Sequence, residues 1–245
     1  MFQKIINTLV LVMFFMVAGF GGYVVWDKQA HRRPGNLGPN VRASFSSEIS
    51  EPQVDPTAYI HPAASVIGRV TIGQRVFVAP MASLRGDEGQ PIFIGNGSNV
   101  QDGVVLHALE TEEDEKPIEQ NLVTVDGKQY AVYVGENVSL AHQSQVHGPA
   151  KIGNDTFVGM QALVFRAEVG SGCVIEPGAK VLGGVKIADH RYVPAGMVVA
   201  TQAQADKLPE ITDDYPLKSL NKGVLHVNTQ LADGYRNGGE AGGEH

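Results

Sequence analysis

Branched aliphatic residues recur every six positions along most of this chain. The spacing forms four runs, and the positions in them are far too many for coincidence. Six is not a helical period, so the pattern excludes a continuous amphipathic helix or a heptad repeat. The runs are Ile60, Val66, Ile72, Val78 and Leu84; Ile94, Val100 and Leu106; Val134, Leu140, Val146, Ile152, Val158 and Val164; and Val169, Ile175, Val181, Ile187, Val193 and Val199.

A second small or aliphatic residue lies two positions before many of these aliphatics, and glycine often comes directly after them. Val70 before Ile72 and Gly73 after it are one example. Alternation over two residues is typical of a short β-strand, and glycine permits the positive φ of a tight corner. The pattern therefore predicts an all-β fold: a parallel β-helix with one strand per six residues and three strands per coil.

The composition agrees with narrow coils and excludes several classes of protein. The chain has 29 glycines, and aromatic residues make up only 7% of it. Its net charge of −7 argues against a nucleic-acid-binding protein, because phosphate groups need a dense basic surface. The single cysteine, Cys173, excludes an internal disulfide and any Cys-x-x-Cys motif.

The sequence divides into five segments. Residues 1–26 are expected to be a signal peptide or a membrane anchor, because residues 5–25 are nearly all apolar and long enough to span a bilayer. Residues 27–53, with several prolines, glycines and serines, are expected to form a linker. The β-helix then occupies residues 54–200, a helical segment residues 201–235 and a disordered tail residues 236–245. We therefore expect an extracytoplasmic protein, either periplasmic, secreted or anchored through residues 5–25.

Beyond Val199 the apolar spacing changes to steps of three and four residues, which predicts a C-terminal α-helix lying along the β-helix. Asp213 and Asp214, followed by Pro216, are typical of a helix start. The apolar positions of this helix are Leu217, Leu220, Val224, Val227 and Leu231.

The six-residue spacing is interrupted at three places. Four extra residues lie between Leu84 and Ile94, a long excursion separates Leu106 from Val134, and one residue is missing before Val169. Insertions into a solenoid form loops, often on its binding side. The long excursion contains a strongly acidic stretch, residues 110–119.

Three histidines occupy positions whose direction the repeat predicts. His107 and His147 each come directly after an inward-facing aliphatic residue, so both point outward. If the long excursion joins consecutive strands, they lie on one face, one coil apart, at a spacing that suits a shared metal ion. His142 lies on the preceding side of the coil and completes a three-histidine site only if a neighbouring subunit supplies it. We therefore predict a cyclic oligomer, most simply a trimer, with the metal ion at its interface.

Three neutral imidazoles on a dication leave a position for water, whose pKa falls toward ~7, so hydroxide becomes available at neutral pH. Carboxylates are then needed to move protons. Glu88 lies in the four-residue insertion, and Glu110 lies at the start of the long excursion. Gln101 occupies the outward position one hexad before His107, where an amide is suited to hold such a water. The alternative is that the histidines are solvated residues on a strand surface.

Four stretches of sequence resemble the γ-class carbonic anhydrases, a family of trimeric left-handed β-helices. They are residues 83–88 (SLRGDE), 99–110 (NVQDGVVLHALE), 139–148 (SLAHQSQVHG) and 192–199 (YVPAGMVV). The resemblance covers about residues 54–235 and is closest to the exported subclass with an acidic loop.

This resemblance implies reversible hydration of carbon dioxide to bicarbonate by a metal-bound hydroxide at a subunit interface. It implies that His107, His142 and His147 bind zinc or ferrous iron. It also implies that Glu88 accepts a proton from the metal-bound water and that Glu110 passes it to solvent.

The same resemblance implies roles for four further residues. Gln101 orients the hydroxide, Asn228 lies near carbon dioxide, and Arg85 and Asp87 form an ion pair between subunits. The sequence departs from the family at two other positions. His226 replaces a tyrosine, and Phe45 replaces a tryptophan.

Two other functions fit the same repeat. A hexapeptide-repeat acyltransferase uses one outward histidine as a general base and no metal ion, so three histidines arranged for one cation disfavour it. A non-catalytic assembly protein of the γ type is expected to have lost metal ligands or the two glutamates, and this chain keeps all of them.

Overall fold

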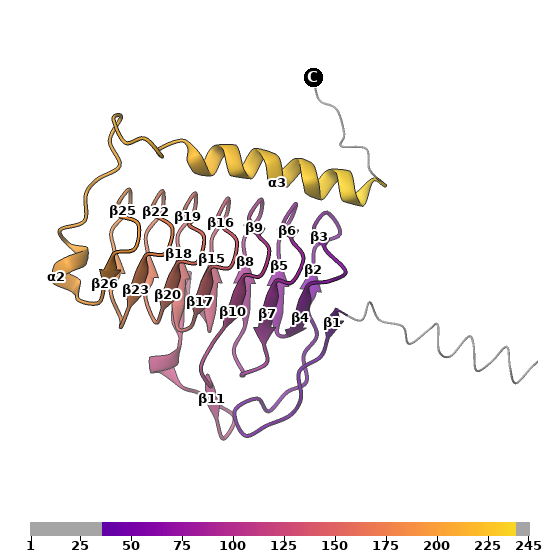
Figure 1. The fold of residues 1–245 in the computed structure, drawn as a ribbon. Helices are drawn as coiled ribbons and strands as arrows, with labels where there is room; N and C mark the ends of the chain where they lie inside the picture. Colours follow the sequence, from indigo (N-terminus) through magenta and orange to yellow (C-terminus); the bar gives the residue numbers. More distant parts are fainter. Residues whose placement is uncertain (1–35, 239–245) are drawn as a thin grey trace, which may run out of the picture. The chain divides into compact units, whose positions relative to one another are not determined.

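The computed structural model of the protein describes residues 36–238; residues 1–35 and 239–245, with the predicted targeting segment, lie outside the described part. Short parallel strands stack in three sheets, and successive coils of the chain add one strand to each sheet (Figure 1). We name each sheet after one of its strands.

The β10 sheet contains, in spatial order, β1 (Leu37–Gly38), β4 (Ser65–Gly68), β7 (Ser83–Gly86), β10 (Val105–His107), β17 (Gln145–His147), β20 (Leu163–Phe165), β23 (Lys180–Leu182) and β26 (Val198–Val199). The β8 sheet contains β2 (Gln53–Val54), β5 (Val70–Ile72), β8 (Ile92–Ile94), β15 (Val132–Val134), β18 (Ala150–Ile152), β21 (Glu168–Val169) and β24 (Lys186–Ile187). The β9 sheet contains β3 (Tyr59–Ile60), β6 (Phe77–Val78), β9 (Asn99–Val100), β16 (Ser139–Leu140), β19 (Phe157–Val158), β22 (Val174–Ile175) and β25 (Tyr192–Val193).

The core is a column of the predicted aliphatic residues. Every aliphatic position of the six-residue repeat is buried except Ile60, which is half-buried at the first coil. The small residues two positions earlier, such as Ala64, Ala82 and Cys173, are buried beside them. The predicted parallel β-helix is therefore confirmed, and its interior has room for side chains up to leucine and isoleucine in size.

The two larger interruptions of the repeat leave the coils as loops, as predicted. Residues 87–91 bulge out between β7 and β8, and the long excursion between β10 and β15 forms two hairpins. They are made by β11 (Glu112–Glu113) with β12 (Lys116–Pro117) and by β13 (Val123–Val125) with β14 (Lys128–Tyr130), with a short 3-10 helix, Glu119–Asn121, between them. Figure 1 shows the β11 hairpin on the far side of the coils from the C-terminal helix.

The described part of the expected linker, residues 36–53, is folded. Strand β1 pairs with β4, and β2 pairs with β5, so this segment begins the solenoid. Asn40 is buried, and its amide donates to Ser46 Oγ at 2.7 Å and to the Glu48 carbonyl at 2.8 Å. These bonds join residues with no periodic pattern. The composition of the segment, which is typical of a linker, therefore does not reveal that it is folded. Parallel pairing of strands begins before residue 54, within the segment that the composition predicts as a linker.

The C-terminal segment contains two helices, α2 (Gln202–Ala205) and α3 (Leu220–Arg236). Thr201 caps α2, since its hydroxyl accepts from the Gln204 backbone amide. The second helix lies over β3, β6, β9 and β16 and so covers the β9 sheet, which confirms the predicted C-terminal helix (Figure 1). Within residues 36–238, no helix is long and apolar enough to cross a membrane.

Helix α3 begins later than the expected start at Asp213 and Asp214. Residues between them and Leu220 turn inward instead, and Tyr215 stacks on Tyr192 with ring centroids 4.2 Å apart. Burial raises the pKa of Tyr215 above its usual range, and the hydrogen bond that its hydroxyl donates to Glu176 at 2.8 Å adds to the effect. Packing on the solenoid thus outweighs the local helix-start signal.

The burial of the repeat positions allows a prediction of how much one of them contributes to the free energy of unfolding. Ile152 is fully buried on β18, so Ile152→Ala is expected to lower the free energy of unfolding by about 2–5 kcal/mol. The matched control is Ile49→Ala, because Ile49 is 59% exposed; its effect should stay within about 0.5 kcal/mol. Chemical denaturation measures both, and equal effects would contradict the assignment of the core.

Candidate active site

His107 and His147 lie side by side on neighbouring strands of the β10 sheet. Strands β10 and β17 pair in parallel, with His107 opposite His147. Their ring centroids are 5.4 Å apart, and the ring planes are inclined at 78°. The long excursion therefore joins consecutive coils without shifting the repeat, and the predicted pairing of these histidines is confirmed.

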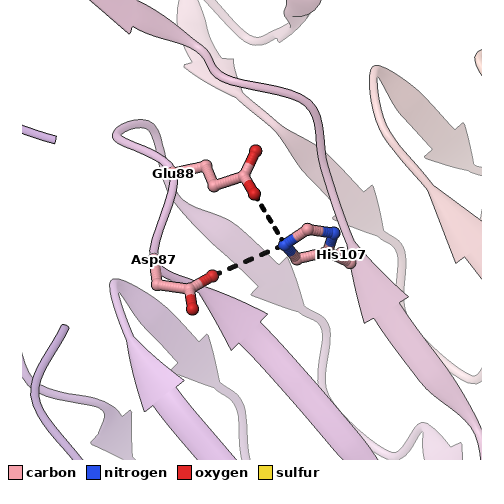
Figure 2. A group of neighbouring side chains, drawn as sticks. All are labelled: Asp87, Glu88 and His107. Carbon is pink, nitrogen blue, oxygen red and sulfur yellow. Dashed lines mark ion pairs between the residues drawn. The ribbon is translucent and has the colours of Figure 1, made fainter. Parts of the chain in front are cut away.

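Two carboxylates from the 87–91 loop reach His107 (Figure 2). Glu88 Oε1 lies 2.9 Å from His107 Nε2, and Asp87 Oδ1 lies 3.6 Å from the same nitrogen. Neither approach has hydrogen-bond geometry, so the buried atoms His107 Nε2 and Asp87 Oδ1 have no hydrogen-bond partner. Unpaired polar atoms at such a site are what a bound cation would satisfy.

Arg85 and Asp87 form an ion pair within the chain. Arg85 Nε and Nη2 both donate to Asp87 Oδ2, each at 3.0 Å. The arginine comes from the outer face of β7, one strand away from His107. This pairing leaves Asp87 Oδ1 as the oxygen that faces His107.

The environment shifts the pKa of the two residues in closest contact. Burial raises the pKa of Glu88 above its usual range, and the negative charge of Asp87 adds to the effect. Burial lowers the pKa of His107, with a further contribution from the positive charge of Arg85. A neutral imidazole is the form that binds a metal ion, so the site favours the form of His107 that is needed.

A second group of predicted residues lies at the β9 sheet and on helix α3. Gln101, His142 and Asn228 line a groove of about 810 Å³ between this sheet and α3. Gln101 and Asn228 are buried, and the Gln101 amide donates to Asn99 Oδ1 at 2.9 Å. The rest of the groove is mainly apolar, with Phe157 among its walls.

The predicted site residues thus fall into two groups on different faces of one chain. Within residues 36–238, one set of three or more possible metal ligands lies within 4.8 Å, and it consists of Asp87, Glu88 and His107. His147 adjoins this set, whereas His142 belongs to the groove. The structure therefore brings two of the three histidines together and leaves the third apart, as the repeat predicts.

Glu110 lies at the start of the acidic excursion and is exposed. Its backbone carbonyl accepts from the Asn121 side chain at 2.7 Å, which ties the start of the excursion to the short 3-10 helix. Its negative charge contributes to the raised pKa of Glu88. The two predicted proton-transfer residues are therefore close enough to interact electrostatically.

Each of the three histidines has one ring nitrogen available for a metal ion. His147 Nδ1 is 3.1 Å from the Gly148 carbonyl, and His142 Nδ1 is 3.0 Å from Asp102 Oδ2. Both partners accept hydrogen bonds, so Nδ1 carries the proton in the neutral rings and Nε2 keeps its lone pair. His107 Nε2 makes no hydrogen bond. The donor set therefore fits a metal ion.

Two residues that adjoin the site were not singled out from the sequence. Asp102 orients His142, and Thr111 bonds to the backbone of Glu88. Both are distant in sequence from their partners: the stacking of coils brings Asp102 to His142, and the folding of the long excursion brings Thr111 to Glu88. Of the two departures from the family, His226 is exposed on α3 beside Gln230, whereas the Phe45 carbonyl lies beside Gly89 of the 87–91 loop.

Comparison with known proteins gives a close relative. A carbonic anhydrase of Methanosarcina thermophila is 62% identical over 82% of this chain and 81% of its own length. A carboxysome assembly protein, CcmM of Nostoc, is 38% identical over 78% of this chain, which spans only 32% of that protein. No family model matches the chain.

A solved structure of a hexapeptide transferase family protein from Anaplasma phagocytophilum superposes with a TM-score of 0.59, covering 81% of this chain and 97% of that one at 22% identity. At that identity the likeness shows the fold alone. The carbonic anhydrase of Methanosarcina thermophila is much closer in sequence, and the match covers 81% of its length. On that evidence, together with the β-helix and the paired histidines, this chain belongs to the γ-class carbonic anhydrases.

Proposed function

We propose that this protein catalyses the reversible hydration of carbon dioxide to bicarbonate. The observation that carries the proposal is the 62% identity to a carbonic anhydrase over most of both chains. The geometry supports it, since three histidines each have a ring nitrogen free for one metal ion and two glutamates lie beside them or close by. The active site is formed between subunits of a trimer.

The predicted site residues lie in two separate groups on one chain, so a complete site needs residues from two subunits. His107 and His147 project from the β10 sheet, whereas His142 comes just after β16 of the β9 sheet, and the core between the sheets is filled with buried side chains. A neighbouring subunit that presents its groove to the β10 sheet supplies the third histidine. Exposed apolar residues at the groove, Met160, Val227 and Leu231, are suited to be covered by such a partner.

Family membership implies a metal cofactor, and the proposed ligands are His107, His142 and His147. When bound, zinc or ferrous iron lowers the pKa of a water molecule and so provides hydroxide near neutral pH. A set of three imidazoles suits either ion. Asp102 holds His142 in the tautomer that this requires.

The side chains around the proposed metal site have separate roles in proton transfer and substrate binding. Glu88, half-buried against His107, accepts a proton from water in the site, and its raised pKa suits it to hold that proton. Glu110, exposed at the start of the acidic excursion, passes the proton to buffer. Gln101 and Asn228 provide amides in a mainly apolar groove, which suits carbon dioxide, a small substrate without charge.

The two rival functions have less support. The acyltransferase proposal rests on fold alone, because the solved transferase family structure is only 22% identical. The assembly proposal rests on a relative that is 38% identical and of which this chain spans 32%. The metal ligands and both glutamates are present in this chain, which favours an enzyme.

Mixed trimers test the shared site. His107→Ala and His142→Ala are each expected to abolish carbon dioxide hydration and metal binding. When the two variants are refolded together in equal amounts, about a quarter of the interfaces regain a complete ligand set, so about a quarter of the wild-type activity should return. No recovery in properly assembled mixed trimers would contradict a site shared between subunits. His226→Ala, on the exposed face of α3, is the control for histidine removal.

The proton path gives a second prediction. Glu110→Ala should lower kcat in weak buffer by roughly 10²-fold or more while kcat/KM changes far less, and added imidazole should restore kcat. Glu113→Ala removes an exposed acid of the same excursion and serves as the control. Stopped-flow hydration assays measure both, and unchanged turnover in the Glu110 variant would remove this residue from the mechanism.

We also propose that the apolar stretch at residues 5–25 takes the enzyme out of the cytoplasm, either as a cleaved signal or as a membrane anchor. The intact mass of the protein from its native membrane and soluble fractions distinguishes these forms. A cytoplasmic protein of full-length mass would contradict the proposal.

A further inference from the structure

Glu88 belongs to the 87–91 loop, whose backbone is not part of the repeat. A catalytic carboxylate on such a loop needs a support outside the strand ladder, because the surrounding coil does not determine its position. The support is found in the long excursion after β10. It is Thr111, the residue directly after Glu110.

Thr111 is fully buried and makes four hydrogen bonds. Its backbone amide donates to the Glu88 carbonyl at 3.0 Å, and its hydroxyl donates to the same oxygen. The hydroxyl also accepts from the Gln90 amide at 2.6 Å. Its carbonyl accepts from the Ile118 amide at 2.8 Å, which links the two ends of the β11 hairpin.

The backbone between Glu88 and Gln90 lies in close contact with Thr111. Gly89 has a φ of +97°, and a Cβ built there would lie 2.8 Å from Thr111 Oγ1 and 2.9 Å from the Phe45 carbonyl. The next residue of the excursion, Glu112, is buried and accepts from the Ser47 amide at 3.1 Å. The Thr111 contact is thus buried beneath the N-terminal segment.

One residue therefore connects both proton-transfer groups. The Glu88 backbone is held by Thr111, while its carboxylate reaches His107 at 2.9 Å. Glu110 precedes Thr111 by one residue, and its carbonyl is held by Asn121 at 2.7 Å. Movement of Thr111 would displace Glu88 and Glu110 together.

We propose that Thr111 is a positioning residue that sets the Glu88 carboxylate against the metal site and keeps Glu110 in line with it for proton transfer. This role rests on the proposed function, since it concerns the proton path of carbon dioxide hydration. Thr111 itself touches neither substrate nor metal ion. It acts through the backbone of the two glutamates.

The test compares three substitutions. Thr111→Val keeps the shape but loses both hydroxyl bonds, and it is expected to lower kcat in weak buffer by roughly 3–10-fold with a smaller change in kcat/KM, while imidazole restores kcat. Thr111→Ser keeps the hydroxyl and should stay within about twofold of wild type. Thr124→Val replaces an exposed threonine of β13 and should change neither constant.

A double substitution separates positioning from a merely structural role. If Thr111 acts through Glu110, adding Glu110→Gln to Thr111→Val should lower kcat less than the same change does in the wild type. Equal effects, or unchanged kcat in Thr111→Val, would overturn the inference.

The outcomes also separate this inference from the proposed function. A wild-type protein that does not hydrate carbon dioxide removes the proposed function, whereas an active wild type with a fully active Thr111→Val removes only the role of Thr111. If the valine variant does not fold, the smaller Thr111→Ala takes its place in the same assays. If neither folds, Thr111 is a folding residue and the inference is wrong.

Discussion

The structure depends on the parallel pairing of each coil with the next. Strands in such a sheet lie about 4.8 Å apart, so residues at the same place in successive coils become neighbours whatever lies between them in sequence. His107 meets His147 and Asn99 meets Ser139 in this way, across an excursion that contains two hairpins. The pairing therefore creates sites from residues far apart in the chain, and it keeps them rigid because the core behind them is filled.

The same rigidity separates side chains that lie on different faces. A three-sided coil cannot bring a residue of the β9 sheet to the β10 sheet, so His142 and His107 stay apart within one chain. Residues on the loops that leave the coil are not positioned by the strand ladder. Both glutamates of the proposed proton path lie on such loops, and hydrogen bonds through Thr111 and Asn121 hold these loops in place, as the strand ladder holds the histidines.

Local periodicity was enough to predict the fold, the inward aliphatics and the pairing of His107 with His147. All three follow from the six-residue spacing, because each strand takes one period of six residues and each coil takes three such periods. Contacts that depend on several unrelated segments could not be predicted in this way. The hydrogen bonds around Asn40, the support of Glu88 by Thr111 and the bond from His142 to Asp102 each join residues with no common pattern. The start of α3 was misplaced for the same reason, since Tyr215 is held by the solenoid rather than by its neighbours in sequence.

The central claim is that neither face of one chain holds the metal ion by itself. Native mass spectrometry of anaerobically purified protein, with gentle dissociation into subunits, tests it directly. A site shared between subunits predicts trimers that carry one metal ion per subunit interface and released monomers that carry none. A metal-loaded monomer, or a fully metal-loaded protein that never assembles, would contradict it.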